Sequence, residues 1–216
     1  EIYTMVDTLS LHDALPIARV DDVLNWLRDN AGFVFDHTRA ALDAFYGGIN
    51  GLLATPNPYL VMAVFAGLGL WLVGWRFALL AGAGLFFCSA MGLWPDTMST
   101  LALVIAATTL GLAIGLPVGV WAGYHPKVDQ LFEPLLDTLQ TLPPYIYLLP
   151  AIALLGYGPA TSLVATVLVA IAPALRLASL GIRMTPNEFI ELGHASGISP
   201  VQMFFKIRLP FAVPSI

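Results

Sequence analysis

The absence of charge over long stretches is the strongest constraint on this 216-residue chain. Residues 77–95, 97–124 and 138–175 contain no Asp, Glu, Lys or Arg, and residues 44–75 form a fourth such window. A helix needs roughly 20 apolar residues to cross the hydrocarbon of a bilayer. The windows therefore predict an all-α, polytopic membrane protein, with spans at about 59–75, 77–94, 98–123, 131–155 and 159–182.

Composition excludes several other classes of function. Only 11% of the residues are charged, against about a quarter in a soluble domain. Residues 1–43 hold eight acids and three arginines, which leaves no basic surface for nucleic acid. Neither lysine follows a Gly-rich phosphate loop, so the sequence predicts no nucleotide site of its own. The histidines show no metal-ligand spacing, and no nucleophile–base pattern stands out, so we expect no metal and no catalytic residues.

The N-terminal region differs from the uncharged windows. Residues 1–17 have neither a basic start nor a long apolar core, so they are no signal peptide, and we interpret them as a possible non-native, adapter-derived segment. Apolar residues recur at helical spacing from 20 to 27, and a second such stretch covers 35–53. Residues 18–58 are therefore predicted to be an amphipathic helical tail on a membrane surface. A solvated helical tail is an equal alternative.

The few loop cations predict an orientation. If the segment after Arg183 is cytoplasmic, alternating loops place Lys127 and Arg76 on the same side. The opposite loops, around 95–97 and 156–161, contain no Lys or Arg. Positive charge favours the cytoplasmic side. We therefore expect a multi-pass protein of the cell (inner) membrane with an external N-terminal tail.

A glycine ladder marks the third predicted span. One face of that helix is formed by Gly111, Gly115, Gly119 and Gly123. Because glycine has no Cβ, a neighbouring helix can approach this face closely. The ladder predicts helix packing inside the bundle, with a subunit interface as the alternative.

The fourth predicted span carries a candidate translocation path, formed by Asp137, Pro143, Pro144, Tyr145 and Tyr147. Prolines break a helix, and broken helices often line a cavity. Tyrosines can hold a quaternary ammonium group by cation–π attraction. The alternatives are ordinary packing of the tyrosines and, for Glu133 and Asp137, interaction with the helix dipole. Arg176 in the fifth span is interpreted as snorkelling to the cytoplasmic surface.

Residues 185–210 are polar enough to leave the membrane and contain two helix signals. Thr185 can cap a helix that starts at Pro186, with Glu188 completing a capping box, and Gly197 can end it in a left-handed conformation. Ser199 and Pro200 then start a second helix, which we expect Leu209-Pro210 to end.

This predicted helical pair mixes polar and bulky side chains on its exposed face, namely Glu191, His194, Gln202, Met203, Phe204 and Phe205. Aromatic residues and Met are enriched where proteins bury one another. The pattern predicts a docking surface, and the alternative is an interfacial helix with its aromatics in lipid.

The same segment resembles a known motif. The order Glu191, Gly197, Ile207, Leu209 and Pro210 resembles the EAA loop of permease subunits of binding-protein-dependent ABC importers. That motif opens Glu-Ala-Ala, whereas this chain has Glu191-Leu192-Gly193. Over residues 98–216 the chain resembles the glycine betaine/proline betaine (quaternary ammonium) subfamily. The resemblance assigns ATPase coupling to Glu191, Gly193, Gly197, Ser199, Pro200, Phe204, Ile207, Leu209 and Pro210.

The resemblance also implies a fold and a set of partners. The fold is the type I importer permease (MetI-like) bundle, with two accessory helices at 59–95 and a permease core at 96–216. The partners are a cytoplasmic ATPase that binds ATP and Mg²⁺, an external substrate-binding protein, a second permease copy and the bilayer. Such permeases continue beyond the EAA loop, so we expect a fragment truncated before the final span. An importer for an amino acid or carnitine, an ion-coupled secondary transporter and a membrane scaffold are the alternatives.

Overall fold

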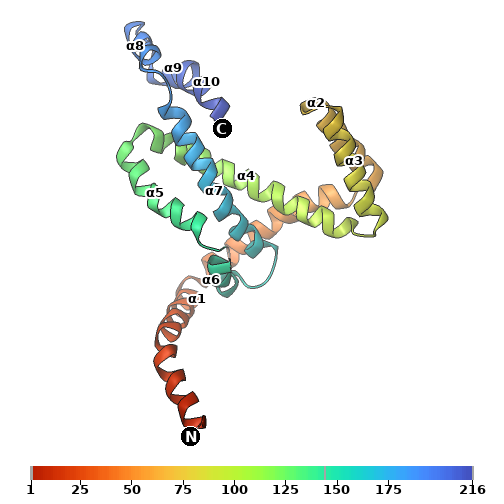
Figure 1. The fold of residues 1–216 in the computed structure, drawn as a ribbon, viewed down its shortest axis with the longest axis vertical. Helices are drawn as coiled ribbons and strands as arrows, with labels where there is room; N and C mark the ends of the chain where they lie inside the picture. The colour runs from red at the N-terminus through yellow and green to blue at the C-terminus, as the bar shows by residue number, and fades with distance from the viewer. Residues whose placement is uncertain (1, 144, 216) are drawn as a thin grey trace.

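In the computed structural model, residues 2–143 and 145–215 are described, and every regular element among them is a helix (Figure 1). The α-helices are α1 Ile2–Ala54, α2 Pro58–Leu72, α3 Trp75–Ala90, α4 Trp94–Tyr124, α5 Pro126–Thr141, α6 Tyr145–Leu155, α7 Pro159–Arg183, α8 Asn187–Ala195, α9 Pro200–Met203 and α10 Leu209–Ala212. A π-helical turn, η1 Phe204–Arg208, and a 3-10 turn, η2 Val213–Ser215, complete the chain.

The centre of the molecule is the crossing of α4 and α7 (Figure 1). Both helices are long and apolar enough to span a membrane. The glycine ladder of α4 is buried against α7, where a Cβ on each glycine would lie 2.7–2.9 Å from a Cβ of α7; the α7 residues are Ala170, Ala174, Ala178 and Ile182. Small residues on both helices thus bring the two backbones into near contact.

Helix α5 covers one side of this crossing. Leu136 is buried with Ala122 of α4 and with Ala172 and Leu175 of α7. Phe132 packs against the same cluster. The apolar stripe of α5 therefore faces the central pair, as expected for an amphipathic helix.

The predicted fourth span is not one continuous helix. Helices α5 and α6 are bent by 94° at a short break that follows Leu142. The helix break predicted near Pro143 is therefore confirmed, and residues 131–155 do not form one straight helix. The break is caused by Pro143, because proline fixes its own φ and disfavours helical backbone at the residue before it, here Leu142. The pair forms either a broken span or a re-entrant loop.

The first two predicted spans form a helical hairpin. Gly74 joins α2 to α3 with φ +126°, and Phe77 of α3 lies against Gly69 of α2. With 15 and 16 residues, these helices are shorter than the roughly 20 residues of a straight crossing. The hairpin stands beside the far end of α4 (Figure 1).

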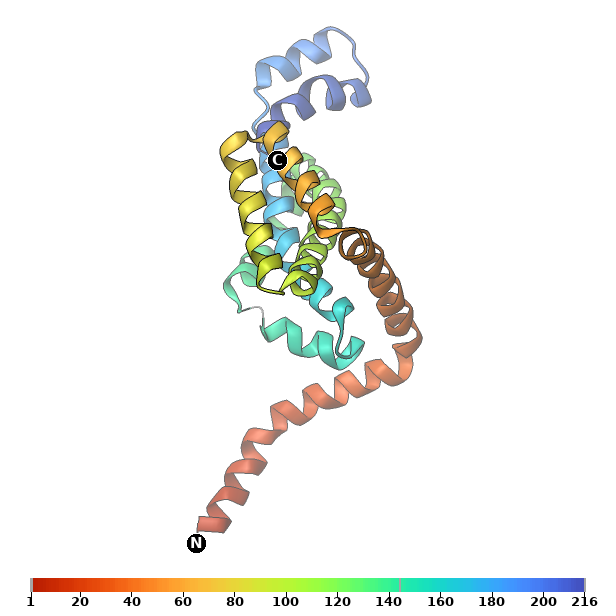
Figure 2. The ribbon, with the colours of Figure 1, turned by 90° about the vertical axis from the view of Figure 1, so that its right-hand side faces the viewer.

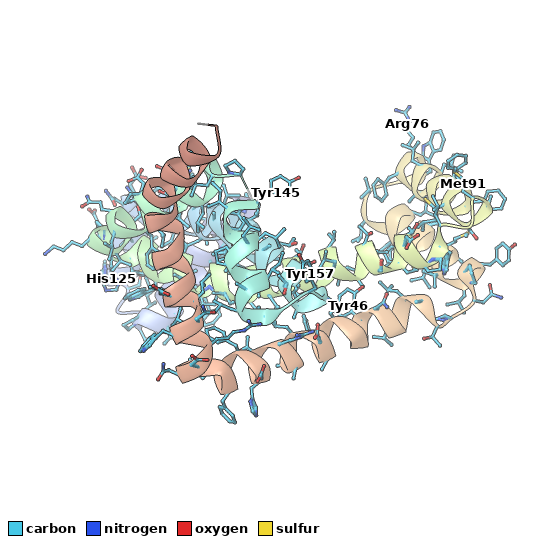
Figure 3. The ribbon with its side chains drawn as sticks, turned by 90° about the horizontal axis from the view of Figure 1, so that it is seen from below. Tyr46, Arg76, Met91, His125, Tyr145 and Tyr157 are labelled. Carbon is cyan, nitrogen blue, oxygen red and sulfur yellow. The ribbon has the colours of Figure 1, made fainter. Side chains whose placement is uncertain are left out.

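The N-terminal region is one helix, α1, and not the pair of helices that the sequence indicated. It bends along its length and then runs beneath the bundle (Figures 2 and 3). Leu42, Tyr46 and Ile49 pack against a buried cluster that includes Ala106 and Leu163. The second half of α1 therefore packs against the core, and the interpretation of residues 18–58 as a solvated tail is wrong for this half.

Candidate coupling segment and translocation path

The candidate coupling segment, residues 185–210, follows α7 and lies at one end of the molecule (Figure 1). Its first helix starts differently from the prediction. Thr185 is buried and its hydroxyl donates to the Ile182 carbonyl (3.0 Å), so it turns back to α7. Pro186 occupies the N-cap position without a side-chain cap bond. The predicted Thr185–Glu188 capping box is therefore wrong, because α7 uses the threonine hydroxyl.

The turn at Gly197 has the geometry of a Schellman motif. Gly197 has φ +67°, which confirms the predicted left-handed conformation. Its amide donates to the His194 carbonyl (3.0 Å), and the Ile198 amide donates to the Gly193 carbonyl (3.3 Å). These two bonds satisfy carbonyls that a helix end otherwise leaves open. The turn fixes the angle between the two arms of the segment.

The second arm starts as predicted and ends differently. Ser199 caps α9 through a full capping box with Gln202. After Met203 the chain forms one π-helical turn, with the Leu209 amide bonded to the Phe204 carbonyl, and then continues into α10. The expectation that Pro210 ends the helix is wrong. The wider turn before it accommodates the ring, which would otherwise clash with a carbonyl one turn back.

The two arms pack against each other at Gly193. A Cβ there would lie 2.6 Å from Met203 Cε and 2.9 Å from Ile207 Cδ1. The rings of Phe189 and Phe211 meet 4.9 Å apart and tie the first arm to α10. Met203 is buried by these contacts, so its predicted place on the exposed face is wrong.

The outer surface of the segment is apolar around an acidic residue. Glu191 is exposed on α8 beside Leu192, which is 61% exposed. Val201 and Phe205 are 65% and 60% exposed on the second arm. A groove of about 320 Å³ separates this arm from α4, lined by Val120, Tyr124, Pro200, Val201, Phe204 and Phe205. Side chains of this kind are typical of surfaces that another protein covers.

The segment is joined to the bundle by close contacts at its base. The backbone of Gly181 in α7 meets Ala212 of α10, whose Cα would lie 3.0 Å from a Cβ on the glycine. The Arg208 guanidinium lies over the ring of Tyr124, 4.4 Å from its centroid, a favourable cation–π position. A displacement of the segment would therefore be transmitted to both α4 and α7.

A polar ladder joins α5 to α7, and sequence reasoning missed it. Asp129 accepts a hydrogen bond from Ser179 Oγ (2.6 Å) and pairs with Arg183. Two turns further, Asp137 accepts from Arg176 Nη2 (2.5 Å). The available signal was two acids eight residues apart on α5 opposite two arginines seven residues apart on α7. Arg176 is therefore held by Asp137, which corrects the interpretation that it only snorkels to the surface.

The structure does not gather the candidate path residues into one site. Asp137 is in the ladder, whereas Tyr145 is 74% exposed at the start of α6 (Figure 3). The Tyr147 hydroxyl is buried and has no hydrogen-bond partner among the described residues. Pro143 lies in the break, and Pro144 lies outside the described residues. Among the residues searched, no group of His, Cys, Asp and Glu could hold a metal ion.

Comparison with known proteins shows which family this chain belongs to. A family described as "binding-protein-dependent transport system inner membrane component" matches residues 115–216, which include α7 and the whole coupling segment. The chain belongs to this family of transporter membrane subunits.

Within the family, several relatives are named as betaine permeases. The chain is 35% identical over 205 residues to the Escherichia coli glycine betaine/proline betaine transport system permease protein ProW. It is 34% identical over 204 residues to the Bacillus subtilis glycine betaine transport system permease protein OpuAB. These alignments cover 91% and 94% of this chain but 56% and 72% of the relatives. A trimethylamine N-oxide permease, TmoV of Ruegeria pomeroyi, is also 34% identical, over 89% of this chain and 31% of its own length.

Proposed function

We propose that this chain is the membrane subunit of an ATP-driven importer for compatible solutes. The observation that carries the proposal is the coupling segment, in which two packed helical arms at the Gly197 turn present Glu191 and apolar side chains outward. ATP and Mg²⁺ are bound by a separate ATPase that grips this surface. The permease itself contributes no catalytic residue and acts as a transporter subunit.

The solute class is inferred from the relatives. Their names give glycine betaine, proline betaine, carnitine and trimethylamine N-oxide as transported compounds. These compounds share a methylated, positively charged nitrogen. We propose that this chain transports the same class, delivered by an external binding protein. An amino acid without a methylated nitrogen is the alternative solute.

The assembly and its orientation are a further part of the proposal. We propose two permease copies, each with its coupling segment on the cytoplasmic side and α1 on the external side of the inner membrane. The apolar exposed faces of α2 and α3 then meet lipid or the second copy. We propose that the path passes the break between α5 and α6, because irregular backbone is tolerated in a membrane only beside protein or a water-filled cavity. Pro143 lies in this break, and Asp137, Tyr145 and Tyr147 lie on the two helices that flank it.

Co-purification with the partner ATPase tests the docking surface. Glu191→Lys reverses a charge on the exposed face of α8 and should reduce ATPase recovery at least tenfold. The matched control is Asp22→Lys, which reverses an exposed charge on α1, far from the coupling segment in sequence, and should leave recovery unchanged. Equal recovery with both variants would refute the docking role.

Solute uptake into proteoliposomes tests the transport role. Vesicles holding the permease, the ATPase and the binding protein should accumulate glycine betaine only when ATP is present on the ATPase side. Excess trimethylamine N-oxide should compete, and unmethylated glycine should not. Uptake that persists without ATP under an imposed ion gradient would instead indicate an ion-coupled secondary transporter.

A further inference from the structure

The first turn of α7 has no cap of its own. Its N-cap, Gly158, has no side chain, and Pro159 at the first helical position has no N–H. The Ala160 amide, the second of the helix, donates to Asp43 Oδ1 at 2.9 Å. An N-cap side chain normally accepts a bond from the second or third amide of its helix. Asp43 therefore caps the start of α7, although it belongs to α1 and lies 117 residues away in sequence.

Arg39, one turn earlier on α1, holds the turn that precedes α7. Its Nη2 donates to the Tyr157 carbonyl at 3.2 Å, and its Nε lies 3.6 Å from Asp43 Oδ2. A Cβ on Gly156 would lie 2.7 Å from Arg39 Nη1, so the guanidinium rests on bare backbone. Gly156 also has φ +74°, which glycine adopts at no steric cost.

Neighbouring contacts fix the position of α1 relative to the starts of α4 and α7. Tyr46, one turn beyond Asp43, donates its hydroxyl to the Ser99 carbonyl at the start of α4 (3.4 Å). Figure 3 shows Tyr46 and Tyr157 on adjoining elements beneath the bundle. Thr161 donates to the Gly156 carbonyl at 2.5 Å and closes the turn from the α7 side. Helix α1 thus holds the starting ends of both α4 and α7.

Helix α7 connects this contact to the coupling segment. It has 25 residues, a length of about 37 Å at 1.5 Å per residue. One end is held by Asp43 and Arg39, and the other leads through Thr185 into α8. Between them the glycine ladder of α4 keeps the two helices in backbone contact. Because the start of α7 is bonded to α1, a displacement at its other end acts against a held point.

We propose that Asp43 and Arg39 are positioning residues that anchor the end of α7 remote from the coupling segment. With the anchor in place, a displacement of the coupling segment tilts α7 about a fixed point instead of shifting the whole helix. Without it, part of the displacement is lost in movement of the α6–α7 turn. This inference rests on the proposed function for its role in transport, but the anchor itself can be tested separately.

Hydrogen exchange of the full chain in lipid nanodiscs tests the anchor. In Asp43→Ala, the amides of residues 160–163 should exchange about fivefold faster, which corresponds to a typical cap contribution of about 1 kcal/mol. Asp43→Asn should stay within about twofold of wild type, because Asn caps as well as Asp. Asp29→Ala, the same change at an exposed position of α1, is the control. Exchange in Asp43→Ala that equals this control would overturn the proposal.

The ratio of solute imported to ATP hydrolysed tests the role in transport. In the reconstituted assembly, Asp43→Ala should lower this ratio at least threefold while ATPase recovery stays normal, and Asp43→Asn should preserve it. An unchanged ratio in Asp43→Ala overturns the transport role. If wild type imports no solute, the proposed function fails, whereas the exchange result still decides whether Asp43 caps α7.

A second variant keeps the test open if Asp43→Ala does not accumulate. Arg39→Gln removes the bond to Tyr157 and leaves Asp43 free to cap. It should speed exchange at residues 156–158 and lower the ratio of import to hydrolysis, relative to Arg76→Gln at an exposed position of α3. Equal behaviour of the two glutamine variants would count against the anchor.

Discussion

Substitution of Gly197 separates backbone conformation from packing in the coupling segment. Gly197 has φ +67°, and a Cβ at this position would meet no atom within 4 Å. Gly197→Ala therefore introduces no clash, and its whole effect comes from placing an L-residue in the left-handed region. That conformation costs roughly 1–2 kcal/mol for a residue with a Cβ.

The strain sets the size of the expected effect on ATPase binding. If the free segment relaxes out of the turn, the ATPase must restore it, and affinity falls by the strain energy. A cost of about 1–2 kcal/mol corresponds to a factor of about 5–30. Asn visits the left-handed region more readily, so Gly197→Asn should lose less. Gly197→Pro should lose most, because proline cannot reach this φ and removes the amide that bonds to His194.

Titration of the purified ATPase against the permease in nanodiscs measures these affinities. The predicted order of affinity is Gly, Asn, Ala, Pro. Gly193→Ala is the packing comparison, because its methyl group would meet the ends of Met203, Ile207 and Ile198, so any loss of affinity there comes from overpacking between the arms and not from backbone strain. Wild-type affinity in Gly197→Pro, or a greater loss in Asn than in Ala, would refute the argument that the turn presents the docking surface.

Further predictions concern the bundle. Gly119→Val should destabilise the protein by about 3 kcal/mol, because a Cβ there would lie 2.7 Å from the Cβ of Ala178 and close to the α7 backbone. The thermal midpoint should therefore fall. Gly84→Val is the control and should leave the midpoint unchanged, because a Cβ at Gly84 would meet no atom within 4 Å. Asp137→Ala should cost up to about 1 kcal/mol by removing the partner of Arg176, and a double-mutant cycle that gives additive effects would show that the pair does not interact. Tyr147→Phe removes a buried hydroxyl without a partner, so the thermal midpoint should stay or rise, and a drop in import at unchanged stability would place this residue on the solute path.

The parts that could be predicted from sequence are those decided locally. Four glycines at spacing four make a flat helix face, and Ser199 followed by Pro200 starts a helix with the capping box that its local sequence allows. The uncharged windows likewise required membrane-type helices. In each case the residue's own chemistry leaves few alternatives.

The parts that escaped prediction depend on distant partners. Thr185 has the chemistry of a cap, but the Ile182 carbonyl takes its hydroxyl. Pro210 breaks an α-helix, but a π-helical turn accommodates it. Neither outcome is visible without the neighbouring turn in three dimensions. The same holds for Asp43, whose partner amide lies 117 residues away, and for the arginines of α7, which acquire meaning only opposite the acids of α5.

The backbone contact between α4 and α7 also limits how this sequence can vary over evolution. Where side chains fill an interface, one change of volume can be offset by another across it. Where glycine faces alanine, almost no compensating substitution is available, because the partner side chain is already a single methyl group. We expect random mutagenesis to return glycine at Gly111, Gly115 and Gly119 in nearly every active clone, whereas Gly123, which faces the larger Ile182, tolerates change when Ile182 is shortened. The hairpin of α2 and α3, with its open faces, should accept many apolar replacements.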